Sequence, residues 1–223
     1  MNINTALLTK CTLFRDFEEA DIQKFITCLE PREKNYEKGE FVFHAGEAVK
    51  SMYILLSGSV HIIEEDFWGN RSIIEAMDGV LLFGEAYVFS NMEKYLVSVV
   101  AAETAKILIV PPDRMLESCL AGTHLQAILT RNIAYILSLK VVGLTQKVGH
   151  VIQRSTQEKL FSYLSKCAKR EGKNAFFIPY SRQQLADYLC VDRSALSHEL
   201  SKLQKCGIIR YCKNHFELLT KLN

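Results

Sequence analysis

The spacing of hydrophobic residues changes along the chain and predicts several structural regions. From Lys34 to about Pro111, apolar residues recur at every second position in short runs separated by glycines. A spacing of two is typical of β-strands, and many short strands without long helices between them close into a barrel or roll. Residues 5–30, before these strands, have a helical spacing that ends at Pro31. We expect this helical segment to dock on the roll.

After Pro112 the spacing returns to that of a helix for about seven turns. A helix this long needs a partner to cover its apolar stripe, and a second copy of itself is the simplest one. The sequence therefore predicts a homodimer through this helix, with packing on the roll as the alternative or companion. Gly143 and Gly149 weaken the helix, and we expect a hinge there. The stripe steps by threes and fours through Leu125, Leu129, Ile133, Leu137, Val141, Leu144, Val148 and Val151.

Two shorter helices follow near the C-terminus, joined by a corner at Cys190-Val191. Ser181 and Gln184 have the spacing of a capping box at the start of the first helix. The carboxylate of Asp192 is expected to cap the second helix, because it suits the orphan amides and the positive end of the helix dipole. Leucines at spacings of three and four pack the two helices together, and Gly207 ends the second one. This pattern is typical of a helix-turn-helix.

The outer face of the second helix presents hydrogen-bonding side chains near its N-terminus, namely Arg193, Ser194 and His198. A helix backed by apolar residues that exposes such side chains suits the major groove of DNA. The alternative is a solvated helical hairpin of any α-protein. The strands predicted at residues 208–211 and 216–219 favour DNA binding, because they would form the wing of a winged helix-turn-helix.

Apolar residues make up 48% of the 223 positions, and the net charge is only +2. The charges are nevertheless distributed unevenly along the chain. Residues 151–223 hold 13 Lys and Arg against 6 Asp and Glu, whereas residues 1–150 hold 14 against 19. The C-terminal third is therefore at +7 and the remainder at −5. A basic segment beside an acidic one fits a DNA-binding module attached to a domain that avoids DNA.

Three stretches of the sequence resemble motifs of a known family. The motif R-Q-Q-L-A-D-Y-L-C-V-D-R-S-A-L-S, residues 182–197, resembles the DNA-binding motif of the bacterial cyclic AMP receptor protein and fumarate-nitrate regulator (Crp/Fnr) family, in particular its clostridial-type branch. The run K-G-E-F-V-F-H-A-G-E, residues 38–47, and the run Y-I-L-L-S-G-S-V, residues 53–60, resemble the cyclic-nucleotide-binding roll of the same family. The resemblance implies an α+β fold. It places a β-roll at residues 1–120, a dimerisation helix at 121–152 and a winged helix-turn-helix at 153–223.

The resemblance also implies roles for individual residues. The positions of Arg193, Ser194 and His198 read bases in the family, although His198 replaces the usual arginine. The positions of Ser181, Arg182 and Gln183 hold phosphate in the family, and we expect Lys202 and Lys205 to add phosphate contacts because they flank the reading face.

The cassette that would hold a cyclic phosphate in this family begins at Phe83-Gly84-Glu85. Its second half, an arginine followed by serine or threonine, is missing, because Tyr95–Val100 offers only Ser98 as a polar group. Burying a phosphodiester without a cation costs several kcal/mol, as an order of magnitude. We therefore expect weak or no cyclic AMP binding and a different small-molecule effector at Gly84, Glu85 and Ser98. The alternative for these residues is structural: Gly84 turns the chain, and Glu85 caps or contacts the neighbouring helix.

We expect neither a metal site nor a membrane-spanning helix. The seven cysteines are scattered without a C-x-x-C pair, which argues against an iron-sulfur cluster and for a reducing cytoplasm. No two histidines have the spacing of a ligand pair for haem or metal. No charge-free apolar run approaches the ~18 residues of a membrane span, so we expect no membrane-spanning helix.

The sequence thus predicts a homodimeric, ligand-responsive transcription regulator that binds double-stranded DNA at a palindromic site, with RNA polymerase as a further partner. An enzyme built on the roll is the second hypothesis, but the paired histidine and glutamate spacing of a metal-dependent cupin is missing. A regulatory subunit that uses the roll to control a protein partner is the third. We expect no enzymatic activity.

Overall fold

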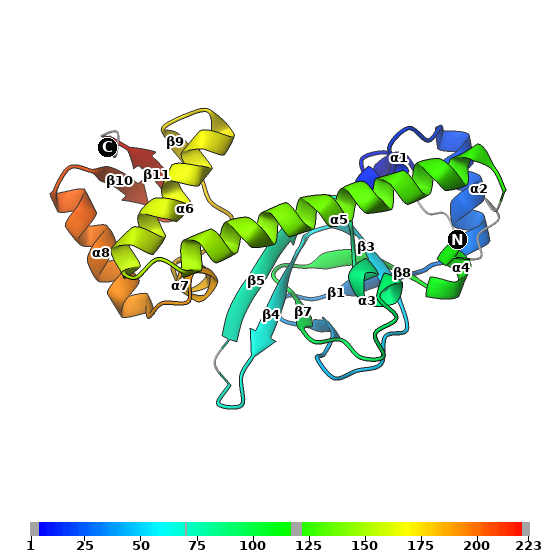
Figure 1. The fold of residues 1–223 in the computed structure, drawn as a ribbon, viewed down its shortest axis with the longest axis horizontal. Helices are drawn as coiled ribbons and strands as arrows, with labels where there is room; N and C mark the ends of the chain where they lie inside the picture. The colour runs from blue at the N-terminus through cyan, green and yellow to red at the C-terminus, as the bar shows by residue number, and fades with distance from the viewer. Residues whose placement is uncertain (1–4, 70, 117–121, 220–223) are drawn as a thin grey trace. The chain divides into compact units, whose positions relative to one another are not determined.

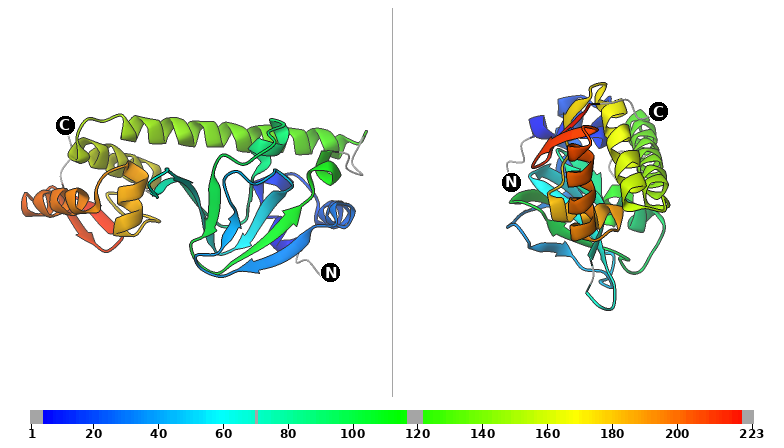
Figure 2. Two further views of the ribbon diagram at one scale, coloured as in Figure 1. Left: turned by 90° about the horizontal axis from the view of Figure 1, so that it is seen from below. Right: turned by 90° about the vertical axis from the view of Figure 1, so that its left-hand side faces the viewer.

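The computed structural model describes residues 5–69, 71–116 and 122–219, so Cys119, one of the seven cysteines, lies outside it. The chain divides into two compact units. The first comprises residues 1–70 and 74–140, and the second comprises residues 71–73 and 141–223. Helix α5, His124–Val151, runs from one unit into the other as a single uninterrupted helix (Figures 1 and 2).

The first unit begins with short helices rather than with one helix over residues 5–30. The segment breaks at Asp16, whose φ of 66° is left-handed, and α2 ends where Glu30 has a φ of 44°. Both residues leave the right-handed region, so the helical hydrogen bonds cannot continue. The helical elements are α1 (Thr5–Leu8), a 3₁₀ turn (Thr12–Phe14), α2 (Glu19–Leu29), α3 (Glu85–Phe89) and α4 (Pro112–Leu116).

Two four-stranded sheets form the expected roll. Strands β1, β8, β3 and β6 pair in that order in one sheet, and β2, β7, β4 and β5 pair in the other. Figure 1 shows these sheets beside α5. The strands are β1 (Arg32–Tyr36), β2 (Phe41–Phe43), β3 (Met52–Ser57), β4 (Ser59–Glu65), β5 (Arg71–Asp78), β6 (Leu81–Phe83), β7 (Ser98–Ala101) and β8 (Ala105–Val110).

Strand β3 separates two hydrophobic cores, because successive side chains of a strand point to opposite faces. Tyr53 and Leu55 belong to the core inside the roll, whereas Met52, Ile54 and Leu56 belong to a second core outside it. Both faces of β3 are thus buried, which explains its uninterrupted apolar sequence.

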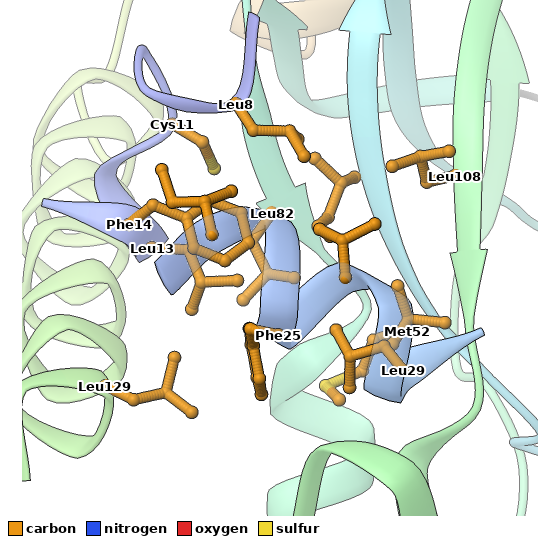
Figure 3. Close-up of a cluster of buried hydrophobic side chains, with 14 of the residues drawn as sticks. Leu8, Cys11, Leu13, Phe14, Phe25, Leu29, Met52, Leu82, Leu108 and Leu129 are labelled. Carbon is orange, nitrogen blue, oxygen red and sulfur yellow. The ribbon is translucent and has the colours of Figure 1, made fainter. Parts of the chain in front are cut away.

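The outer core fixes the start of α5 on the roll. Figure 3 shows Leu129 of α5 on one side of Phe25 of α2, with Leu29 of α2 and Met52 of β3 on the other side of that ring, all in one buried cluster. Asn132, also on α5, is buried, and its side-chain amide donates to the carbonyl oxygens of Leu13 at 3.0 Å and Arg15 at 2.7 Å. The alternative that the long helix packs on its own roll is therefore realised by this part of α5.

The second unit holds the elements predicted for a winged helix-turn-helix. Helix α6 begins with a capping box in which the Ser155 hydroxyl accepts from the Glu158 amide at 3.2 Å. The sheet order is β10, β11, β9: the two strands of the expected wing pair with each other, and β11 also pairs with β9, the strand that precedes the helix-turn-helix. The elements are α6 (Thr156–Glu171), β9 (Ala175–Phe177), α7 (Arg182–Leu189), α8 (Arg193–Lys205), β10 (Ile209–Cys212) and β11 (His215–Leu218).

Candidate nucleic-acid interface and ligand cavity

Local interactions build the helix-turn-helix as the sequence predicts. At the start of α7 the Ser181 hydroxyl accepts from the Gln184 amide at 3.4 Å, and the Ser181 amide donates to Gln184 Oε1 at 2.7 Å. The corner after α7 depends on Cys190, whose φ of 52° is left-handed, and its amide donates back to Asp187 O at 3.2 Å. The capping box and the sharp corner fix the direction in which α8 leaves α7.

The predicted cap of α8 is only half right. Asp192 occupies the N-cap position, and its carbonyl oxygen accepts from the Leu196 amide at 2.9 Å. However, its carboxylate makes no capping hydrogen bond, and the residue is exposed. The expectation of a side-chain cap was therefore wrong: the backbone alone begins the helix, and the carboxylate remains in solvent.

The three residues expected to read bases are all exposed on α8, whose opposite side is buried through leucines. Arg193 and Ser194 occupy the first turn, and His198 follows on the next turn. Helix α8 thus has one apolar and one polar face, with the hydrogen-bonding groups free to meet a ligand. The buried leucines are Leu196, Leu200 and Leu203.

The residues expected to contact phosphate differ in their exposure and in the contacts that they already make within the protein. Ser181 and Lys205 are exposed, and no partner is found for Lys205 among the residues that the structure covers. Gln183 donates to Asp187 Oδ1 at 2.8 Å, and Lys202 lies 3.6 Å from Glu199 Oε2 and donates to Gln157 at 3.4 Å. Gln183 and Lys202 therefore already have contacts within the protein, although each keeps further donors.

Arg182 is held by a residue that the sequence analysis did not connect with it. Its guanidinium lies 4.8 Å from the ring centroid of Tyr211 in the wing strand β10. Partial burial, together with the nearby charge of Arg193, lowers the pKa of Arg182 from its ordinary value, while the guanidinium stays charged near neutral pH. The ring therefore fixes the direction of a cation beside the reading face.

Lys159 of α6 also supports the corner and was missed. Its ammonium donates to the carbonyl oxygens of Leu189 and Cys190, each at 3.3 Å. These carbonyls end α7, where the backbone lacks helical partners, so the lysine stabilises the corner from outside the motif. Nothing in the local sequence pattern distinguishes Lys159 from a solvated lysine.

In the roll, the expected effector residues are committed to contacts within the protein. Glu85 is fully buried, and the ammonium of Lys140 on α5 donates to its Oε2 at 3.0 Å and lies 2.8 Å from its Oε1. The Ser98 hydroxyl accepts from the Ala45 amide at 2.9 Å. Gly84 has a φ of 79°, and a Cβ there would lie 3.1 Å from the Tyr53 ring. The structure thus realises the helix contact that the sequence offered as an alternative for Glu85.

Aromatic rings fill the space beside these residues. The ring centroids of Phe43 and Tyr95 lie 3.9 Å apart, and those of Tyr53 and Phe83 lie 5.1 Å apart. The Tyr95 hydroxyl donates to Ser51 O at 2.8 Å. Tyr95 begins the segment where the family places its phosphate-binding arginine, so a ring fixed inside the core stands near that position instead of a cation.

A cavity of about 200 Å³ remains between the roll and the first part of α5. Its walls are mainly apolar, and Glu75 and Lys140 are the charged residues that line it. Burial raises the pKa of Glu75; the Lys140 charge opposes this shift and the Glu85 charge adds to it. The lining residues are Thr12, Glu75, Met77, Leu81, Leu82, Ile136, Leu139 and Lys140.

No grouping of metal ligands is found among the described residues. His44 is exposed and stacks on Phe41 with ring centroids 4.1 Å apart, while buried His150 makes a 2.7 Å hydrogen bond with the Ser162 hydroxyl. Cys11 is buried, and burial raises the pKa of its thiol to about 11. His44 and His150 therefore contact other side chains of the protein, and Cys11 lies in its interior.

Comparison with known proteins agrees with both halves of the structure. A family model described as the cyclic nucleotide-binding domain matches residues 33–121, and one described as the Crp-like helix-turn-helix domain matches residues 158–221. Together they span well over half of the chain. The chain belongs to the Crp/Fnr family of transcriptional regulators. It is thus a DNA-binding regulator with a ligand-binding type of domain, and the expected fold class is confirmed.

Individual members of the Crp/Fnr family are similar over most of the chain. The electron transport regulator A of Shewanella oneidensis is 24% identical over 185 residues, which cover 80% of this chain and 71% of that protein. The transcriptional activator protein FnrA of Stutzerimonas stutzeri is also 24% identical, with coverages of 80% and 72%. These relatives are regulators rather than enzymes, as expected.

A solved structure shows the same fold. The c-di-GMP-responsive global regulator CLP of Xanthomonas campestris superposes with a TM-score of 0.73 at 20% identity. The alignment covers 92% of this chain and 100% of that protein. The two proteins therefore share their overall fold.

Helix α5 combines a long apolar stripe with isolated charges. The helix is long enough, and with a mean hydropathy of 1.4 over 18 residues apolar enough, to cross a membrane by length and composition. Charged residues such as Lys140 nevertheless interrupt its apolar residues, so it contains no long charge-free run. Lys140 and Asn132 of this helix make polar contacts with other elements of the first unit, at Glu85 and at the Leu13 and Arg15 carbonyl oxygens.

Proposed function

We propose that the protein is a homodimeric, effector-responsive transcription regulator that binds a palindromic operator. In this proposal residues 1–120 sense the effector, residues 121–152 dimerise and residues 153–223 bind DNA. The observation that carries it is the polar face of α8: Arg193, Ser194 and His198 are exposed, while the opposite face is buried. A two-fold dimer would present two such helices to half-sites about one DNA turn, roughly 34 Å, apart.

Arg193 is the strongest candidate for base recognition. Its guanidinium can donate two parallel hydrogen bonds to guanine O6 and N7, worth about 1–3 kcal/mol of discrimination. Ser194 and His198 would contact neighbouring bases. Ser181, Arg182, Gln183, Lys202 and Lys205 would hold phosphates and set the register of α8 on the duplex.

We infer that the effector is a small molecule other than cyclic AMP. The type of domain supports a small-molecule site, but Glu85 of the cassette is already paired with Lys140, and Tyr95–Val100 offers no arginine to the phosphate of cyclic AMP. The cost of burying an uncompensated anion opposes such binding. Calorimetric titration with cyclic AMP and cyclic GMP should detect no micromolar binding, and a micromolar affinity would contradict this inference.

The remaining attributes follow from the same proposal. We infer a cytoplasmic regulator of the clostridial-type branch without an iron-sulfur cluster, whose dimer contacts RNA polymerase when bound to DNA. The scattered cysteines support the absence of a cluster, since the described ones do not group with other metal ligands. The apolar face of α5 supports dimerisation rather than insertion in a membrane, because part of the helix is already fixed to the roll.

The experiment is a fluorescence anisotropy titration of the full-length protein with duplexes from its own upstream region, at several salt concentrations. Arg193→Ala should reduce the preference for the operator over a scrambled duplex about tenfold or more. Lys205→Ala should weaken all duplexes alike and reduce the salt slope by about 1. Lys24→Ala, an exposed lysine of the first unit, is the control and should change neither quantity. Unaltered site preference in Arg193→Ala would refute the assigned reading face.

A further inference from the structure

A second cavity, of about 390 Å³, lies wholly within the second unit. Its walls come from the end of α5, the C-terminal half of α6 and Tyr188 of α7. Three cationic side chains of α6 line it, namely Lys166, Lys169 and Arg170, and none of its described lining residues is acidic. A concave surface with charges of one sign concentrates ions of the opposite sign, so this cavity attracts anions.

The cations of the wall keep donors for a ligand. Neither Lys166 nor Lys169 makes a hydrogen bond or ion pair with a residue that the structure describes. Arg170 donates through Nε to Oε1 of Glu171 at 3.1 Å, and Glu171 does not line the cavity. The terminal amino groups of Arg170 remain available, because a guanidinium has five N–H donors. Even when that ion pair is counted, the wall retains two positive charges.

His150 of α5 adds a buried polar group to the same wall. Its side chain is only 4% exposed, and its Nδ1 lies 2.7 Å from the Ser162 hydroxyl. The other ring nitrogen, Nε2, makes no hydrogen bond with a described residue, which is uncommon for a buried polar group. When Nδ1 accepts from the hydroxyl, Nε2 carries the ring proton and can donate to an anion. Burial, followed by the charge of Lys166, lowers the pKa of His150, so the ring and the ammonium lie near each other.

We propose that this cavity binds a small phosphate monoester, with Lys166, Arg170 and Nε2 of His150 donating to the phosphate oxygens. A phosphate monoester carries about two negative charges near neutral pH and has three strong acceptor oxygens. A cation would instead meet three like charges, and a neutral ligand would form no charge-assisted hydrogen bonds. The inference goes beyond the proposed function, because it gives the DNA-binding unit a ligand site separate from the effector site of the roll.

Size and wall chemistry describe the rest of the ligand. The cavity has room for roughly thirteen water molecules of ~30 Å³ each, so it holds more than a phosphate ion. Tyr163 and Tyr188 supply an aromatic wall, with ring centroids 5.5 Å apart, against which one ring of a ligand can pack. The ligand would contact α5, α6 and α7 together. It would therefore favour one arrangement of the helix-turn-helix on the end of α5, as a bound ligand shifts a conformational equilibrium.

The test compares three molecules with one aromatic ring by calorimetric titration of the full-length protein at pH 7.5 and low ionic strength: phenyl phosphate, benzyl alcohol and benzylammonium. We expect measurable binding of phenyl phosphate and about tenfold or more weaker binding of the other two. No binding of phenyl phosphate, or equal or tighter binding of benzylammonium, would overturn the proposal. This comparison uses the unmodified protein and does not depend on the folding of a variant.

A pair of variants locates the binding. Lys166→Met removes the ammonium but keeps an unbranched apolar side chain, and it should reduce the affinity for phenyl phosphate about tenfold or more. Lys173→Met removes an exposed lysine of the same unit that does not line the cavity, and it should leave that affinity unchanged. Equal losses in the two variants would show that phenyl phosphate responds only to the overall charge of the unit, and would overturn the proposal.

A second measurement separates the cavity from the DNA interface. In the absence of phenyl phosphate, Lys166→Met should bind operator DNA in anisotropy titrations with the affinity and the salt slope of the wild type. Weaker binding to all duplexes with a reduced slope would show that Lys166 contacts DNA phosphate, and would overturn the proposal. A failure of the proposed function is recognised separately, because the wild type itself would then show no preference for operator DNA.

Discussion

The ammonium of Lys140 lies 2.8 Å from Oε1 and 3.0 Å from Oε2 of Glu85, and the glutamate side chain is completely buried. Glu85 begins α3 in the roll, and Lys140 is on α5, so this ion pair joins two elements 55 residues apart. In a cyclic-nucleotide site the same glutamate position would face the ligand. Here the chain itself supplies the group that meets this carboxylate.

Removing the lysine should therefore destabilise the first unit. Lys140→Met keeps a long apolar side chain but leaves the Glu85 carboxylate buried without its cation, and we expect a loss of about 3–5 kcal/mol in the free energy of unfolding. Urea denaturation followed by circular dichroism measures this loss. The double variant Lys140→Met, Glu85→Gln should recover most of it, because the uncompensated charge is gone. Equal stability of the single and double variants would contradict the argument.

Sequence reasoning reached the elements that short-range interactions determine. The capping box of Ser181 and Gln184, the end of α8 before Gly207 and the length of α5 depend on neighbours within about one or two helical turns, so the pattern predicts them. The contact between Lys140 and Glu85 is decided by how α5 lies on the roll. No spacing in the sequence encodes that distance.

In the helix-turn-helix, too, the correct predictions concern features fixed by helical periodicity, and the failed or missed ones concern side-chain contacts. The positions of Arg193, Ser194 and His198 on the open face follow from helical periodicity, because three buried leucines fix the opposite face. The missing carboxylate cap at Asp192 and the ring of Tyr211 over Arg182 depend on side-chain conformations. These could not be predicted, because several rotamers are compatible with each position.

A glycine substitution tests the packing of the roll. Gly58 has a φ of 83°, and a Cβ there would lie only 2.3 Å from the backbone oxygen of Thr104. Gly79 has a similar φ of 77° but nothing within 4 Å, so it is a matched control for the backbone strain alone. We expect Gly79→Ala to cost about 1 kcal/mol of unfolding free energy and Gly58→Ala at least ~2 kcal/mol more, measured by urea denaturation. Similar losses for both would show that the clash relaxes without cost.

His150 should make the stability of the second unit depend on pH. Its side chain is buried against α6, where it contacts the Ser162 hydroxyl at 2.7 Å. Burial, and secondarily the charge of Lys166, lowers its pKa below the ordinary value near 6.5. The unfolded chain therefore binds a proton more readily than the folded one as the pH falls through about 6.5, and the folded state loses stability there.

The measurement is the free energy of unfolding at pH 7.5 and at pH 5.5. We expect the wild-type protein to lose more stability between these values than His150→Gln, because glutamine keeps a polar side chain that does not titrate. His198→Gln is the control in the same unit, since His198 is exposed, and it should show the full wild-type loss. If His150→Gln lost as much stability as the wild type, another group would be responsible.

The second half of α5 carries an exposed apolar stripe that tests the proposed dimer. Val141, Leu144 and Val148 follow each other at spacings of three and four, with exposed fractions of 63%, 48% and 55%. A helical face of this kind is favourable in water only when a partner covers it. Leu144→Lys together with Val148→Lys should therefore give a monomer in sedimentation velocity, whereas Gln146→Lys, an exposed polar position on the same helix, should leave the dimer intact.

Because a monomer can occupy only one half-site at a time, the double variant should bind a palindromic duplex about 10²–10⁴-fold more weakly, although Arg193 is unaltered. A double variant that remained dimeric and kept its operator affinity would place the dimer interface elsewhere.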